Sequence, residues 1–185
     1  MNATDICNAA LGMIGQNFIA ALDDGTHTAN QCNIFFLPAR DACLRDHLWN
    51  FAQKRAALAQ TAAPVSRWPY AYQLPADCLR IVALNADAQL RWAVEGRTLV
   101  TDEPSATVLY IAKVDDVNLW DALFVDTFTI LLASKLALAV AHDAGYSGEL
   151  LKLYNLRLAD AKAVDGQEQG VPDSLGAPDL IDVRG

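Results

Sequence analysis

The hydrophobic pattern changes its period twice along this chain, and that change limits the folds that it can adopt. Residues 1–48 and 118–165 carry apolar side chains three or four positions apart, the spacing of a helix face. Residues 49–117 instead hold short runs of aromatic and β-branched residues, which are typical of strands. Prolines separate these runs: Pro64, Pro69, Pro75 and Pro104. The sequence therefore predicts an α+β protein, mainly α: a helical bundle with an inserted small antiparallel β-region.

Residues 1–48 predict two helices. Asn2 or Thr4 can cap the first helix, and Gly15 can end it. Thr28, followed three residues later by Gln31, has the form of a capping box and opens the second helix. One face of that helix is expected to be buried, and it is formed by Cys32, Phe35, Phe36, Ala39 and Cys43. The two cysteines on this face are then core thiols.

Residues 118–165 predict two more helices. The segment 121–144 is apolar on most sides, so we expect it to be the central buried helix. Gly145 suits a left-handed C-cap and Ser147 the following N-cap, which places the break between the helices there. The last helix is expected to bury one face, formed by Leu151, Tyr154, Leu158 and Ala161.

The middle of the chain predicts a single antiparallel sheet of four to six short strands. Residues 70–74 alternate with period two, and 79–84 and 107–114 are further apolar runs. Residues 90–94 and 98–100 flank Glu95-Gly96-Arg97, which favours a hairpin turn.

The last twenty residues, 166–185, differ from the rest in composition. They hold four glycines and two prolines, which favour an extended arm over a helix or strand. Such an arm can reach roughly 60 to 70 Å at about 3.3 Å per residue. We expect the arm to become ordered against an adjacent copy or another partner; the alternative is a terminus without a role. The side chains expected to make this contact are Leu175, Leu180, Ile181, Val183 and Arg184.

Composition excludes several classes of protein. Hydrophobic residues make up 53% of the chain and charged residues only 19%, which predicts extensive burial or a partner surface. The net charge of −8 argues against tight wrapping of nucleic acid, although an acidic protein can still surround DNA without gripping it. The most apolar stretch, residues 122–141, is interrupted by Asp126 and Lys135, so we expect a soluble chain without a membrane span or secretory signal.

Motifs for catalysis, metals and cofactors are missing. The four cysteines, Cys7, Cys32, Cys43 and Cys78, form no C-x-x-C pair, so we expect free thiols, no bound metal and no cofactor. The three histidines lie in different segments without a ligand or base motif. Glu95 and Asp102 are the only weak candidates for a glycosidase pair, and solvated turn acids are the more ordinary interpretation. We therefore expect a protein that is not an enzyme.

Five aromatic residues lie in or near the predicted β-region: Trp49, Trp68, Tyr70, Tyr72 and Trp92. We interpret most of these rings as core of the small sheet. Four members of the set are candidates for a partner interface where they are exposed: Trp68, Tyr70, Tyr72 and Trp92. Stacking on nucleic-acid bases is a weaker third interpretation because few basic residues accompany them.

Several blocks of sequence carry a family resemblance. They are residues 6–15 (ICNAALGMIG), residues 38–52 (PARDACLRDHLWNFA) with Lys54-Arg55, residues 68–80 (WPYAYQLPADCLR), and Tyr110-Ile111-Ala112 followed by Trp120 and Phe124. In this order they resemble the tail tubular protein A-type adaptors of short-tailed bacteriophages, over roughly residues 5–165.

The resemblance implies a helical bundle with an inserted β-region, assembled as a dodecameric ring. Such a ring lies under the portal protein and joins the DNA-filled head to the tail nozzle protein, leaving a channel that DNA passes without specific binding. The implied location is the virion, after assembly in the host cytoplasm, with no membrane involved. The alternatives are a tail-associated peptidoglycan-degrading enzyme, which needs two placed carboxylates, and a soluble host-type adaptor domain without a viral role.

Overall fold

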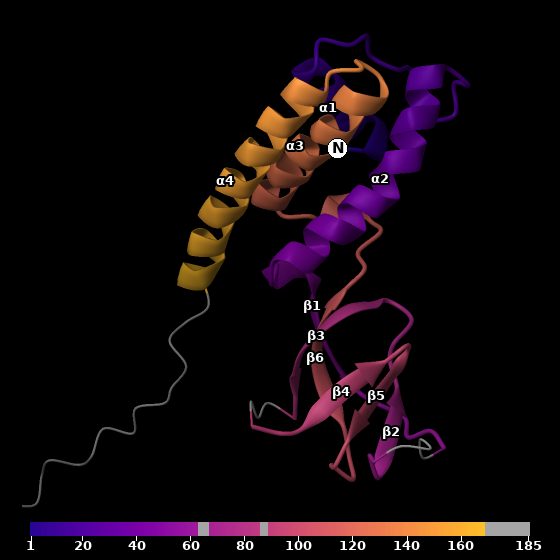
Figure 1. Cartoon of the computed structure of the whole chain (residues 1–185), viewed down its shortest axis with the longest axis vertical. Coiled ribbons are helices and arrows are strands. Elements are labelled where there is room, and N and C mark those ends of the chain that lie inside the picture. Colours follow the sequence, from indigo (N-terminus) through magenta and orange to yellow (C-terminus); the bar gives the residue numbers. More distant parts are fainter. Residues whose placement is uncertain (63–66, 86–88, 169–185) are drawn as a thin grey trace, which may run out of the picture.

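A computed structural model describes residues 1–62, 67–85 and 89–168 (Figure 1). The helices are α1 (Ala3–Met13), α2 (His27–Asp46), α3 (Ala122–Ala139) and α4 (Ala144–Glu168), with two short 3₁₀ turns, η1 (Asn50–Ala52) and η2 (Val117–Leu119). The strands are β1 (Gln53–Ala57), β2 (Tyr70–Gln73), β3 (Cys78–Leu84), β4 (Trp92–Glu95), β5 (Thr98–Thr101) and β6 (Thr107–Ala112). All six strands lie between α2 and α3 in the chain, which confirms the predicted α+β class and the inserted β-region.

Helix α1 is closed at both ends by local hydrogen bonds. The Asn2 side chain accepts from the Asp5 N–H at 2.9 Å and the Asp5 carboxylate accepts from the Asn2 N–H at 2.8 Å, a complete capping box. At the other end Gly15 has a φ of 67°, and the Gln16 N–H bonds to the Leu11 carbonyl. This Schellman arrangement explains why a glycine stands directly after the helix.

Helix α2 begins earlier than the sequence predicts. Its N-cap is Thr26, whose side chain accepts from the Ala29 N–H at 3.2 Å, so the prediction of Thr28 as the cap is wrong. Asp24 decides the difference, because its carboxylate accepts from both the N–H and the hydroxyl of Thr26. The predicted buried stripe is otherwise confirmed: Cys32, Phe36, Ala39 and Cys43 are buried and Phe35 is partly buried against them.

Helix α3 lies in the middle of the helical part and packs against α1, α2 and α4 (Figure 1). By length and composition it could cross a membrane, but more than half of it is buried inside this chain. Two of its buried hydroxyls bond within the helix: the Thr129 hydroxyl donates to the Val125 carbonyl and the Ser134 hydroxyl to that of Leu131, each at 2.7 Å. This confirms the central buried helix that the sequence predicts.

The break between α3 and α4 falls before Gly145. His142, not a glycine, takes the left-handed conformation with a φ of 55°, and the Asp143 carboxylate accepts from the Tyr146 N–H at 2.8 Å. Gly145 and Ser147 lie inside α4, so their predicted capping roles are wrong. The Asp143 side chain supplies the missing acceptor at the start of α4, which explains why the helix begins earlier.

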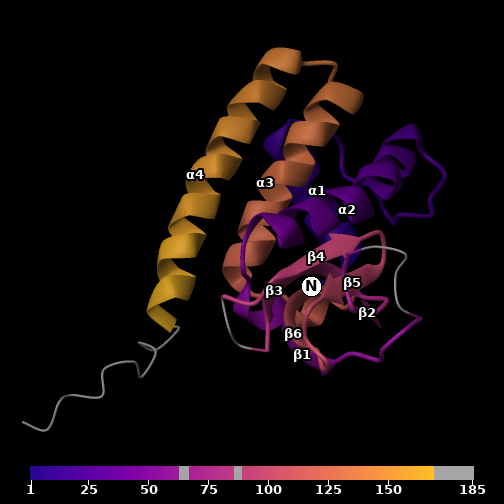
Figure 2. The same cartoon turned by 60° about the horizontal axis from the view of Figure 1, so that its bottom comes forward.

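Helix α4 lies along the outer side of α3 in both views (Figures 1 and 2). It buries Leu150, Tyr154, Leu158 and Ala161, whereas Leu151 is 43% exposed, so the prediction of Leu151 on the buried face is wrong by one position. The helix continues to Glu168, so residues 166–168, which the sequence assigns to the extended arm, are helical.

The strands form two three-stranded antiparallel sheets, with orders β1-β6-β3 and β2-β5-β4. The predicted single sheet is therefore wrong, although the strands themselves lie where they were predicted, with β1 in addition. Gly96, at a φ of 62°, and Arg97 form the two-residue turn of the β4–β5 hairpin, in which Glu95 pairs with Thr98.

Trp49 belongs to the core of the helical part and not to the β-region. It is 1% exposed, its indole N–H donates to the Cys43 carbonyl at 2.9 Å, and its ring meets Phe124 edge to face at 5.1 Å. Phe124 also contacts Trp120 and Phe128, which continues the aromatic cluster into α3. The β-region as the structure has it thus begins after η1, at Gln53.

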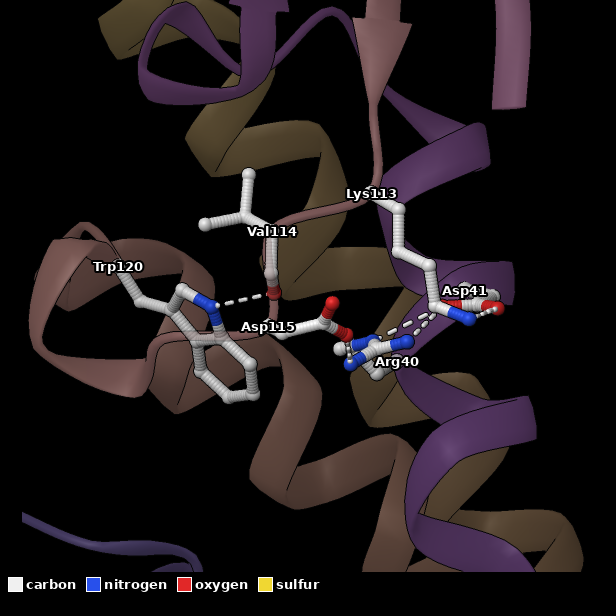
Figure 3. A network of polar contacts seen from close by, with 6 residues as sticks. All are labelled: Arg40, Asp41, Lys113, Val114, Asp115 and Trp120. Atoms are coloured by element: carbon white, nitrogen blue, oxygen red, sulfur yellow. Dashed lines mark hydrogen bonds and ion pairs between the residues drawn. The ribbon is translucent and has the colours of Figure 1, made fainter. Parts of the chain in front are cut away.

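A buried arginine joins the β-region to the helices (Figure 3). Arg40 of α2 is 1% exposed, and its guanidinium donates to Asp41 and, at 2.6 Å, to Asp115 in the segment that leaves β6. Lys113 lies 3.5 Å from the other Asp41 oxygen. Close to Arg40, the Trp120 indole N–H donates to the Val114 carbonyl at 3.1 Å. Because the Trp120 ring also contacts Phe124 of α3, this bond links the segment after β6 to α3.

We predict that the two aspartates contribute unequally to stability. Asp41 accepts two Arg40 bonds and is 30% exposed, whereas Asp115 accepts one and is 77% exposed. Asp41→Asn should lower the free energy of unfolding by about 2–3 kcal/mol, and Asp115→Asn by about 1 kcal/mol or less, because solvent screens an exposed carboxylate. Urea unfolding measures both, with Asp102→Asn as a surface control. Equal losses for Asp41→Asn and Asp115→Asn would contradict this account.

Candidate interface surfaces

Two of the four aromatic residues predicted at a partner interface lie in the core of the β-region. Tyr72 is 2% exposed, its hydroxyl donates to the Glu103 carbonyl at 2.9 Å, and burial raises the pKa of its phenol. Trp68 is 6% exposed and packs with Ala71 and Val100. Neither ring faces solvent in the free chain, so neither can anchor a partner without local opening.

The other two aromatic residues, Tyr70 and Trp92, are half-buried and pack against the cluster that contains Tyr72, whereas Trp68 belongs to a separate cluster. Trp68 itself is covered by charge: the guanidinium groups of Arg67 and Arg91 lie 5.4 and 5.3 Å from the centre of its ring. The remaining predicted interface residues, Leu175, Leu180, Ile181, Val183 and Arg184, lie outside the described residues. Within the β-region, Tyr70 and Trp92 are therefore the members of the set that a partner can reach.

Glu95 and Asp102 lie at opposite ends of the β4–β5 hairpin. Glu95 pairs with Thr98 next to the turn, while Asp102 follows Thr101, which pairs with Trp92 at the far end. Four residues along a strand separate them by about 13 Å at 3.3 Å per residue, wider than the range for a glycosidase pair. Asp102 also lies 3.3 Å from Arg91. The two carboxylates do not form a catalytic pair.

The histidines and cysteines are likewise dispersed. His27 begins α2, His47 ends it with its ring against Trp49, and His142 lies in the α3–α4 connection. Among the described residues no three His, Cys, Asp or Glu side chains come together in a way that could hold a metal. The buried thiols contact different helices: Cys7 of α1 is hydrogen-bonded to Cys32, and Cys43 to Tyr154 of α4. Burial raises the pKa of Cys43, which keeps it in the unreactive thiol form.

Exposed large apolar side chains concentrate on the helical part. Within the described residues, all of them except Val94 lie on helices or their connections. The largest exposed fractions belong to Met1, Phe18, Ile34, Leu119, Leu138 and Leu156. Apolar side chains that gather around a hollow mark a place where another protein can bind, and Leu138 and Leu151 line one hollow together. The sequence predicted partner residues in the β-region and in the arm, and it missed this surface.

Two hollows open on this apolar surface. The first has a volume of about 510 Å³ and lies between α1, η2 and the start of α3, where Ile6, Trp120 and Val125 line it. The second has a volume of about 420 Å³ and lies between α2, the end of α3 and α4, where Phe35, Leu138 and Leu151 line it. Both are mainly apolar, so they can accept side chains of a partner.

The hollows lie on opposite sides of α3 and carry opposite charges. Asp126 lines the first hollow and Lys135 the second, and nine residues correspond to two and a half helical turns. Asp126 is 58% exposed and lies 3.6 Å from Arg157, an exposed pair that solvent screens. Asp126 and Lys135 are the sequence signal for these surfaces, because a charge in an otherwise apolar helix marks a side of α3 that other helices do not fully cover.

Neither a scan against protein-family models nor a search of curated proteins gives a match to this chain. Two apolar hollows with one charge each, on opposite sides of one helix, are suited to binding protein surfaces.

We predict that the purified chain does not degrade peptidoglycan, because its candidate carboxylates stand too far apart to act on one bond. A turbidity assay on isolated cell walls should stay flat, and Glu95→Gln should leave the trace unchanged. Clearing by the unaltered chain that disappears in Glu95→Gln would establish the lytic function instead.

We also predict different costs for the two tryptophans of the β-region. Trp68→Ala should lower the free energy of unfolding by about 3–5 kcal/mol because a buried ring is removed, and Trp92→Ala should cost less because its ring is half-buried already. Thermal and urea unfolding compare the two variants. A larger loss in Trp92→Ala would show that Trp68 is not the core residue.

Proposed function

We propose that this protein is a structural head-to-tail adaptor of a phage virion. In this role copies form a ring, a dodecamer in the family that the sequence resembles, between the portal protein and the tail nozzle protein. Three features support the proposal: the order of the resembling blocks, a β-region inserted between helices, and the exposed apolar surface of the helical part. The last of these carries most weight, because apolar side chains around open hollows favour contact with another protein.

A ring requires two different surfaces on every copy. Each copy presents one surface to the copy before it and the other to the copy after it, which is a heterologous contact. The first hollow, lined by Val125, and the second hollow, lined by Leu138, provide two such surfaces on opposite sides of α3. We assign the first hollow of one copy to face the second hollow of its neighbour.

Charge favours the same pairing. Asp126 at the first hollow and Lys135 at the second are complementary when the two surfaces meet, whereas two copies of one surface would bring like charges together. The net charge of −8 fits a channel that DNA passes without specific binding, because an acidic wall repels phosphate. The helical bundle forms the body of the ring in this proposal, and the arm that follows Glu168 extends to an adjacent copy or to the portal protein.

The charge pairing predicts a specific pattern in assembly. Purified chain mixed with its portal protein should form a discrete larger ring in negative-stain micrographs. Lys135→Glu and Asp126→Lys should each weaken ring formation, at least tenfold in the concentration required, because each places like charges in the contact. The double variant Asp126→Lys with Lys135→Glu should recover part of the loss, since it restores opposite charges.

Lys152→Glu is the matched control, because Lys152 is an exposed α4 residue that lines neither hollow. It should assemble as the unaltered chain does. Rings that form equally well in both single variants would rule out the assigned contact, and a chain that stays monomeric with the portal protein would rule out the adaptor role. A chain ending at Glu168 tests the arm separately: it should still fold and should attach to the portal less tightly.

A further inference from the structure

Three arginines surround one pocket where α2 meets the β-region. The pocket has a volume of about 440 Å³ and is lined by Arg45 from the last turn of α2, Arg80 from β3 and Arg97 from the β4–β5 turn. Its apolar lining comes from Leu74, Leu79, Ile81 and Val94. A site of this size accommodates a short peptide segment or a small molecule.

All three guanidinium groups are held in place by backbone carbonyls. Arg45 donates to the Leu79 carbonyl, and Arg80 donates back to the Arg45 carbonyl at 2.7 Å. Arg97 donates to the carbonyls of Cys78, at 3.1 Å, and Pro75. These bonds fix the three charges but use only one or two of the five N–H donors that each arginine has.

The three positive charges have no carboxylate partner in the part of the chain that the structure describes. The ion pairs there involve other cations: Arg40, Lys54, Arg91, Lys113 and Arg157. Three unneutralised guanidinium groups around one pocket are unexpected in a chain with a net charge of −8. Such a group of fixed donors matches carboxylates, which arginine binds through two parallel hydrogen bonds.

A segment of the same chain has the complementary chemistry. Residues 179–182 read Asp-Leu-Ile-Asp, with one carboxylate on each side of two large apolar side chains. A carboxylate at each end can meet arginines while the apolar residues meet the apolar lining. An inorganic anion would satisfy the charges but leave that lining uncovered.

The segment is also within reach. The Tyr154 hydroxyl donates to Asp46 at 2.6 Å, which fixes this point of α4 beside the residue that follows Arg45. From Tyr154 the helix rises about 21 Å to Glu168, and the next eleven residues can span up to about 36 Å back to Asp179. Figure 1 shows that α4 ends at the same end of the helical part as α2, the end from which the β-region extends.

We propose that the pocket formed by Arg45, Arg80 and Arg97 binds residues 179–182 of its own chain through Asp179 and Asp182. Docked there, the segment lies on its own chain before assembly and has to leave the pocket in order to contact a partner. The proposal does not depend on the adaptor role, because it concerns the single free chain.

Nuclear magnetic resonance of the full-length chain tests it. The backbone amide shifts of residues 179–183 should differ from those of a synthetic peptide covering 169–185. The tail variant Asp179→Asn with Asp182→Asn, which leaves the pocket intact, should remove most of that difference, and so should Arg97→Gln. The matched controls are Asp173→Asn in the tail and Arg91→Gln outside the pocket, and both should leave the difference in place.

Three results would overturn the proposal. The first is coincidence of the shifts in the full-length chain with those of the free peptide. The second is a shift difference that grows with protein concentration, which would mean that the segment binds a second copy. The third is binding of inorganic phosphate at the pocket while residues 179–183 keep the shifts of the free peptide, which would make the pocket a site for another anion.

Discussion

The buried guanidinium of Arg40 is the interaction on which the placement of the β-region depends. A charge that is 1% exposed is unfavourable without partners, and Asp41 and Asp115 supply them from α2 and from the segment after β6. Asp115 and Lys113, which pairs with Asp41, both belong to the segment after β6, so this cluster ties that segment to α2. The reciprocal bonds between Arg45 and β3 hold a second point, so that α2 carries the β-region at two places.

The two parts of the molecule use their apolar residues differently. The β-region buries its large rings in its own small core, and Val94 is its exposed large apolar residue among those described. The helical part buries more than half of α3 yet leaves leucines of α3 and α4 in solvent. The β-region shares Ile111 with the core of the helical part and leaves little apolar surface exposed, whereas the helical part keeps exposed apolar side chains, which is the physical basis of the proposed ring.

The candidate site was less predictable than the fold. Trp68 and Tyr72 are of residue types that are enriched at protein interfaces, but the residue type does not reveal whether a ring faces the core or solvent. The two hollows depend on how α1, α2 and α4 leave opposite sides of α3 uncovered. Only Asp126 and Lys135, two charges in an apolar helix, marked those sides in the sequence.

The sequence by itself determined the type and order of the elements, because hydrophobic period and turn residues act over a few positions. It located the strands, the β4–β5 turn at Gly96 and the buried stripe from Cys32 to Cys43. Tertiary structure decided what rests on contacts between distant residues: two sheets in place of one, Trp49 in the helical core, and the start of α2 at Thr26. It also brought Arg45, Arg80 and Arg97 to one pocket. Their spacing in the chain, 35 and 17 residues, holds no information about their meeting, which follows from packing β3 and the β4–β5 turn against the end of α2.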